Sequence, residues 1–194
     1  MKKTRMIIGL FILLFLIGVI LLVVYYIQRN DMSTMDRAIE KRFSNEVIND
    51  CEKMGKIEYC PAALEKHKKE VEHALANGKS YEEFLKDDKD RRKNLGIKYE
   101  VRNVELSTIY EVDDPQVFQD GWNINGIEEA HMVCVHYQIR EKYDFNPEKY
   151  DKKYYDCVDY VEENNGVWSE WRDFDEWYEA YKVDGKWYCI YADE

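Results

Sequence analysis

The sequence predicts an α+β domain that follows an N-terminal transmembrane helix. An uncharged apolar run comes first, from Met6 to Ile27. Residues 34–95 then carry helix start and stop signals, and much of residues 96–191 alternates between apolar and polar positions, as strands do. Helices followed by strands favour about three helices packed on one face of a bent antiparallel sheet.

The apolar run is long enough to cross a membrane, because as a helix it would extend over about 33 Å, against a hydrocarbon core of about 30 Å. Lys2, Lys3 and Arg5 precede it, so its amino end is expected in the cytoplasm. The plasma membrane protein would then have a cytoplasmic tail (1–5), a transmembrane helix (6–28), a short tether (29–33) and an extracytoplasmic domain (34–194).

A cleaved signal peptide is the alternative interpretation of this run. Signal sequences usually have roughly 7–15 apolar residues that end in a small-residue cleavage site. Here the run is longer, and its outer end reads VVYYIQRND. The first cysteine is Cys51, too distant for a lipoprotein site, so an uncleaved anchor is favoured.

The expected domain begins with helices. Ser33 or Thr34 can cap a first helix from about Met35 to Lys53, which Gly55 would end.

Two further helices have their own signals. Pro61 suits the first turn of the second helix, and Gly78 lies just past its end. Ser80 and Glu83 form a capping box that opens the third, which should stop near Gly96.

The strand region contains one interruption and one clear turn. IKYEVRNVELSTIYEV alternates, but its phase slips near Asn103, as at a β-bulge. AHMVCVHYQIREKY alternates throughout, and Asp184-Gly185 marks a hairpin. A second hairpin is expected at Asn165-Gly166. The stretch 168–176 fits helix and strand about equally, and strand is favoured from Asp175 onward.

The order of these elements, the slipped strand and the closing hairpin VDGKWYCIY (183–191) resemble the nuclear transport factor 2-like (cystatin-like) fold. The resemblance covers roughly Thr34 to Tyr191. A long acidic segment at 141–165 and an irregular connection at 113–128 depart from it. Members of that fold family include enzymes, scaffolds and binding modules, so the resemblance implies a fold rather than a function.

Charge is concentrated in the second half of the chain. Residues 101–194 hold 9 basic and 23 acidic side chains, whereas residues 31–100 are nearly neutral. Such a field repels nucleic acid and attracts basic proteins. Solubility alone is the alternative explanation.

Aromatic and acidic residues are interleaved in this half, most densely in SEWRDFDEWYEAY. Tyr and Trp are enriched at the centres of protein interfaces, and carboxylates around them would steer a basic partner. Many of these aromatics must also form the core. The predicted partner-binding residues are Trp168, Trp171, Asp173, Glu176 and Tyr178.

The five cysteines all follow the apolar run, in a space that permits disulfides. Cys51 and Cys60 flank the expected turn between the first two helices, so a disulfide between them is predicted. The pairing of Cys134, Cys157 and Cys189 stays open. Their spacing matches no zinc pattern.

No catalytic or cofactor motif is present, so neither an enzyme nor a cofactor is expected. His136, Asp156 and Asp159 are candidate bases by residue type only. The loop 113–129 is rich in oxygen ligands, but as a calcium loop it would lack both anchoring carboxylates.

These features predict a membrane-anchored, extracytoplasmic protein-binding module. Small size, a single anchor and an acidic face resemble the outline of TipC-type immunity proteins, which implies a toxin that acts in the cell envelope as the basic partner. A scaffold subunit of a secretion or conjugation machine, and a small-ligand binder or cavity enzyme on the same fold, are the alternatives.

Overall fold

The computed structural model describes residues 14–24, 31–75, 78–115, 124–144 and 165–192. The chain divides into two units, residues 1–32 and 33–194. In the first unit, residues 14–24 form a helix. Across the described ranges, no helix combines the length and apolar character that a membrane crossing requires. The remainder of the predicted span, residues 6–13 and 25–28, lies outside these ranges.

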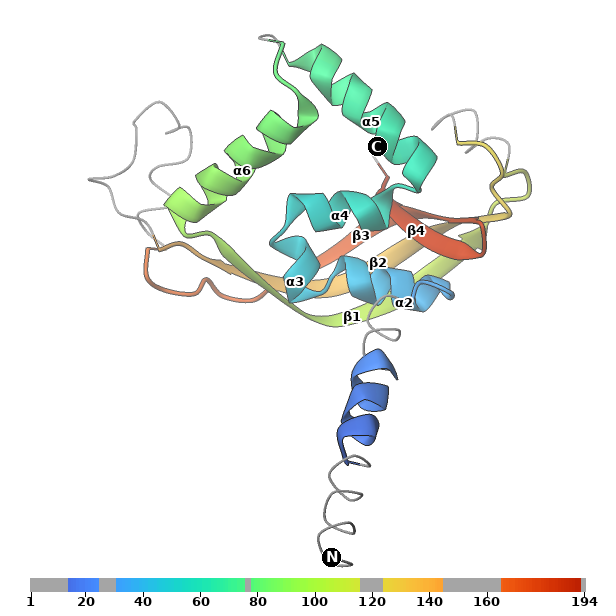
Figure 1. The fold of residues 1–194 in the computed structure, drawn as a ribbon, viewed down its shortest axis with the longest axis horizontal. Coiled ribbons are helices and arrows are strands. Elements are labelled where there is room, and N and C mark those ends of the chain that lie inside the picture. Colours follow the sequence, from blue (N-terminus) through green and yellow to red (C-terminus); the bar gives the residue numbers. More distant parts are fainter. Residues whose placement is uncertain (1–13, 25–30, 76–77, 116–123, 145–164, 193–194) are drawn as a thin grey trace, which may run out of the picture. The chain divides into compact units, whose positions relative to one another are not determined.

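The second unit is an α+β domain with an antiparallel sheet, as predicted. The four strands formed by its described residues follow the order β1-β2-β3-β4. Figure 1 shows α2, α3 and α4 lying along the sheet, while α5 and α6 extend from it as two arms. The strands are β1 (Lys98–Glu111), β2 (Glu129–Lys142), β3 (Arg172–Val183) and β4 (Lys186–Tyr191).

The single helix predicted over residues 35–53 is wrong, because three short helices occupy this region. They are α2 (Met35–Arg42), α3 (Asn45–Ile48) and α4 (Cys51–Glu58), and Gly55 lies inside α4. The breaks come where polar side chains bond outside the helix. Asn49 donates to Tyr99 O (3.0 Å) and accepts from Tyr99 N (2.9 Å), and Asn45 accepts from Val101 N (3.0 Å). Asp50 then caps α4 by accepting from Lys53 N.

The two later helices form as predicted. They are α5 (Pro61–Ala74), with its proline in the first turn, and α6 (Tyr81–Leu95). Both hydrogen bonds of the capping box between Ser80 and Glu83 are present. Gly96 ends α6 with φ +59°, and a β-carbon there would lie 2.5 Å from Asp144 O. Both the backbone angle and this close approach require glycine.

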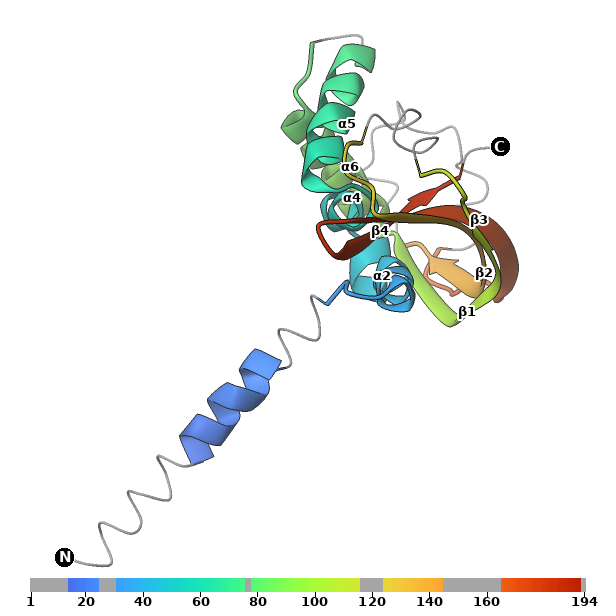
Figure 2. The ribbon, with the colours of Figure 1, turned by 90° about the vertical axis from the view of Figure 1, so that its right-hand side faces the viewer.

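The predicted bulge and terminal hairpin are confirmed. The β1–β2 register shifts between Arg102 and Glu105, and Asn103 has φ +54°. Figure 2 shows β1, β2 and β3 curving together. Asp184 and Gly185 both have positive φ in the β3–β4 turn, as a tight two-residue hairpin requires. The stretch from Arg172 is strand, three residues earlier than expected.

The hairpin predicted at Asn165-Gly166 lies largely outside the described residues. Asn165 forms an isolated parallel bridge to Tyr143.

The core joins α2 to the middle of the sheet. Phe43, directly after α2, lies 4.5 Å from the Tyr137 ring and 5.3 Å from the Tyr178 ring, centroid to centroid. Tyr181 is fully buried, and its hydroxyl donates to Glu58 O (2.9 Å) and accepts from Cys60 N (3.0 Å). Aromatic side chains of β2 and β3 thus hold the helices onto the sheet.

The disulfide predicted between Cys51 and Cys60 is not formed, and both are free thiols. Cys51 begins α4 and Cys60 follows its end. At 1.5 Å per residue this helix separates their Cα atoms by more than about 10 Å, beyond the roughly 7 Å limit for a disulfide. Cys134 and Cys189 are also free, and Cys157 lies outside the described residues.

Candidate protein-binding face

Side chains alternate along β2 and β3 and so separate two faces of the sheet. Val133, Val135 and Tyr137 are buried on the face that contacts Phe43. On the opposite face, the side chains of Asp173 and Asp175 are 62% and 68% exposed. We call this second side the open sheet face. Its residues are Glu100, Arg102, Tyr110, His136, Gln138, Arg140, Trp168, Trp171, Asp173, Asp175 and Trp177.

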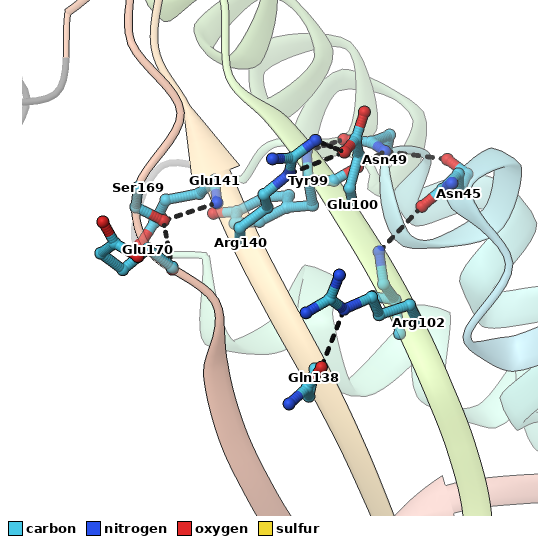
Figure 3. A network of polar contacts seen from close by, with 11 residues as sticks. Asn45, Asn49, Tyr99, Glu100, Arg102, Gln138, Arg140, Glu141, Ser169 and Glu170 are labelled. Atoms are coloured by element: carbon cyan, nitrogen blue, oxygen red, sulfur yellow. Dashed lines mark hydrogen bonds and ion pairs between the residues drawn. The ribbon is translucent and has the colours of Figure 1, made fainter.

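Two arginines and two tryptophans interlock at one end of the open sheet face. The guanidinium carbon of Arg140 lies 4.7 Å from the Trp168 ring centroid and 4.6 Å from that of Trp171. Arg102 lies over Trp171 at 4.0 Å. Arg140 also donates from Nε to Glu100 Oε2 (2.8 Å), as Figure 3 shows. These contacts hold large, flat side chains in one arrangement before any partner arrives.

A ladder of polar contacts continues along the same face. Arg102 Nε donates to Gln138 Oε1 (2.8 Å; Figure 3), and Gln138 Nε2 donates to Asp173 Oδ1 (2.8 Å). The next rung joins His136 Nδ1 to Asp175 Oδ1 at 3.1 Å. Both aspartates stay largely exposed, so each has lone pairs free for cations of a partner.

An exposed aromatic pair lies further along the face. The rings of Tyr110 and Trp177 are stacked with centroids 5.6 Å apart. Tyr110 is 59% exposed and Trp177 is 37% exposed. A stacked, exposed pair of this kind gives a partner rigid apolar area to cover.

Three of the five predicted partner-binding residues lie together on the open sheet face: Trp168, Trp171 and Asp173. The other two point to the covered side, which corrects the prediction. Tyr178 is only 2% exposed. Glu176 Oε2 accepts from Tyr178 Oη (2.8 Å) and from Tyr137 Oη (2.6 Å). Tyr178 is therefore closed to a partner, and the half-buried Glu176 carboxylate is engaged by the two tyrosine hydroxyls.

The surroundings of the two tyrosines that donate to Glu176 favour the protonated hydroxyl. Burial, together with the hydrogen bond to Glu176, raises the pKa of Tyr137. Burial likewise raises the pKa of Tyr178, with the neighbouring Tyr137 adding to the effect. Their hydroxyls therefore stay protonated at neutral pH and donate to the Glu176 carboxylate.

Sequence reasoning missed several residues of this face, chiefly Tyr110, Trp177, Arg102 and Arg140. A period of two counted from Asp173 would have found Trp177 and rejected Tyr178, because side chains an odd number of positions apart on a strand point to opposite faces. The residues of β1 and β2 could be added only with the strand register.

The structure places only some of the residues that are candidate bases or metal ligands. Cys134 is 8% exposed, and His136 bonds to Asp175 rather than to a nucleophile. Asp156 and Asp159 lie outside the described residues. Within the ranges that the structure describes, no group of His, Cys, Asp and Glu is placed to hold a metal ion.

The chain matches no family model, and searches found neither a similar curated protein nor a similar solved structure.

Proposed function

We propose that this protein is a membrane-anchored, extracytoplasmic protein-binding module, and most sharply an immunity protein that neutralises a toxin acting in the cell envelope. The observation that carries the proposal is the open sheet face. It combines ordered tryptophans with exposed carboxylates, which is the pairing expected at the centre and rim of a protein interface. A basic protein is the partner of matching charge.

The anchor has its own support. Residues 14–24 are helical and apolar, and Phe15, Leu21 and Leu22 are 71%, 63% and 68% exposed within this structure. A helix that is apolar on all sides needs an apolar environment, and the uncharged run continues to Met6 and Ile27. With basic residues before it, the acidic domain would face outward. That is where a toxin of the envelope would meet it.

The resemblance in outline to TipC-type immunity proteins supports the sharper version. A neutralising protein needs affinity and shape, but no chemistry of its own. The open sheet face supplies a prearranged surface, since its arginines contact its tryptophans and Gln138 links Arg102 to Asp173. Binding by such a surface loses little side-chain entropy.

Binding can be tested with the tagged full-length chain in detergent or nanodiscs. A basic envelope or secreted protein should be captured by the wild type and lost with Asp173→Lys/Asp175→Lys. The matched control is Glu40→Lys/Asp90→Lys, which makes the same charge change on exposed positions of α2 and α6. Equal capture by both double variants would contradict the assignment of the face.

Immunity can be tested in cells that export the captured partner. Growth should be arrested without this chain and restored with it, and the Asp173→Lys/Asp175→Lys variant should fail to protect at equal abundance. If the partner harms no cell, the protein binds it for another purpose, and the immunity version is rejected.

A further inference from the structure

A groove with a different chemistry lies between the helices of the domain. It has a volume of about 760 Å³ and is lined by α4, α5, α6 and the beginning of β1. Figure 1 shows α5 and α6 as the two arms on either side. Apolar lining comes from Leu64, Tyr81, Leu85 and Ile97. The lining thus offers an apolar surface to whatever enters.

Cations dominate the rest of the lining, although the protein as a whole is acidic. Seven basic and four acidic side chains line the groove. Three of the basic groups are already paired: Lys56 with Glu52, Lys68 with Glu65 and Arg92 with Asp88. The other four lysines are exposed and form no ion pair with a described residue. They are Lys86, Lys89, Lys93 and Lys98.

The central acid of the groove cannot neutralise these lysines, because other groups use it. Asp88 accepts from Cys51 Sγ (3.0 Å), Arg92 Nε (2.8 Å) and Arg91 Nη2 (2.8 Å). Burial alone would raise the pKa of Asp88, but these hydrogen bonds lower it to about 2. The carboxylate is therefore ionised and fully engaged, and the positive potential of the four lysines is left for a ligand.

The spacing of the lysines indicates the kind of ligand. Lys86, Lys89 and Lys93 follow one another at three- and four-residue steps, which places them on one side of α6. They extend over about 10 Å along the helix, too far for one small anion to contact all three. A chain with several carboxylates at similar spacing could pair with each of them, while its apolar side chains cover the apolar lining.

We propose that this groove is a second binding site, which takes an acidic peptide segment with interspersed apolar side chains from a partner protein. Charge complementarity with the four exposed lysines supplies attraction, and Leu64, Leu85 and Ile97 supply the apolar contact. The site is independent of the open sheet face, whose free groups are carboxylates. The protein would then engage surfaces of opposite charge on its two sides.

The test uses the full-length chain in zwitterionic nanodiscs. The probe is a fluorescein-labelled peptide about four helical turns long, with Glu and Leu at helical spacing, and binding is followed by anisotropy. Wild type should bind saturably. Lys89→Glu/Lys93→Glu should weaken binding at least tenfold. The matched control, Lys69→Glu/Lys186→Glu, changes exposed lysines outside the groove and should stay within about twofold.

Two further comparisons separate the groove from general attraction of anions. Replacing Leu by Ser in the peptide, or Leu85→Ser in the protein, should weaken binding several-fold, with folding checked by circular dichroism. The proposal is overturned if wild type does not bind, if the two lysine double variants behave alike, or if the Ser peptide binds as well as the Leu peptide. Displacement of the Leu peptide by phosphatidylglycerol vesicles, without displacement by zwitterionic ones, would instead assign the groove to a membrane surface and overturn it.

Discussion

Trp177 and Tyr178 are neighbours in β3, yet one is 37% exposed and the other 2% exposed. The difference is the alternation of a strand, which turns adjacent side chains to opposite faces. Tyr178 packs on Phe43 beneath α2, whereas Trp177 stacks on Tyr110 in the open. The covered face therefore stabilises the domain, whereas the open sheet face is the side that binds in the proposed function.

The strongest test of this division is Tyr178→Ala. The substitution removes a buried ring that contacts Phe43 and a hydroxyl that donates to Glu176. We expect the free energy of unfolding to fall by about 3–5 kcal/mol. Denaturant titration measures the loss, and Tyr110→Ala is the control, expected to cost less than about 1 kcal/mol. Equal losses would show that the two faces share the work of stabilisation.

The next largest effect should appear on the open side. Trp171→Ala removes a ring that contacts both Arg102 and Arg140, and should weaken partner binding by about 2 kcal/mol or more. Calorimetry with the captured partner measures this. Phe84→Ala, an exposed aromatic on α6, is the control. If Phe84→Ala weakens binding and Trp171→Ala does not, the partner binds the helical side.

A smaller effect separates long-range electrostatic attraction of the partner from its direct contacts with the open sheet face. Raising the salt concentration from low to physiological shortens the Debye length to about 8 Å. We expect the association rate of a basic partner to fall several-fold while the dissociation rate changes little, because exposed carboxylates steer encounter. Surface plasmon resonance across a salt series decides this. An association rate that ignores salt would mean that Asp173 and Asp175 do not guide the partner.

The smallest expected effect is a loss of stability that is absent at neutral pH and appears only at alkaline pH. Burial raises the pKa of Tyr137, Tyr178 and Tyr181 in the folded state. Their contribution to stability is complete below the unfolded pKa of about 10 and is lost as pH rises above it, since only the unfolded chain then ionises them. Absorbance at 295 nm should show these three ionising with unfolding. Tyr178→Phe should flatten the alkaline loss of stability, and an unchanged slope would contradict the linkage.

The sequence predicted those features of the fold that are set by residues close together in the chain. The capping box at Ser80, the αL glycine at Gly96, the bulge at Asn103 and the Asp184-Gly185 turn each depend on neighbours in the chain. The break between α2 and α4 does not. Asn45 and Asn49 carry no local signal that separates them from other helix residues. Their side chains bond to the backbone of β1, and that strand begins about fifty residues later.

The candidate site was predicted only in part, because several of its contacts join residues that are distant in the sequence. Trp168, Trp171 and Asp173 were found from composition, while Tyr178 and Glu176 were chosen without regard to alternation. Arg140, on β2, lies about thirty residues before the two tryptophans that it contacts. Arg102, on β1, lies about seventy residues before Trp171. Only the antiparallel register brings them together.

The asparagines that fasten α3 to β1 have a consequence beyond local geometry. Among the strands that the structure describes, β1 lies at the margin of the sheet, with β2 as its one neighbour. A long strand with unpaired amides and carbonyls can recruit a strand from another molecule. Asn49 occupies both backbone groups of Tyr99, Asn45 occupies the amide of Val101, and Asn103 then bends the strand out of register. These backbone groups of Tyr99 and Val101 are thus closed to foreign strands, which protects the domain from edge-to-edge aggregation.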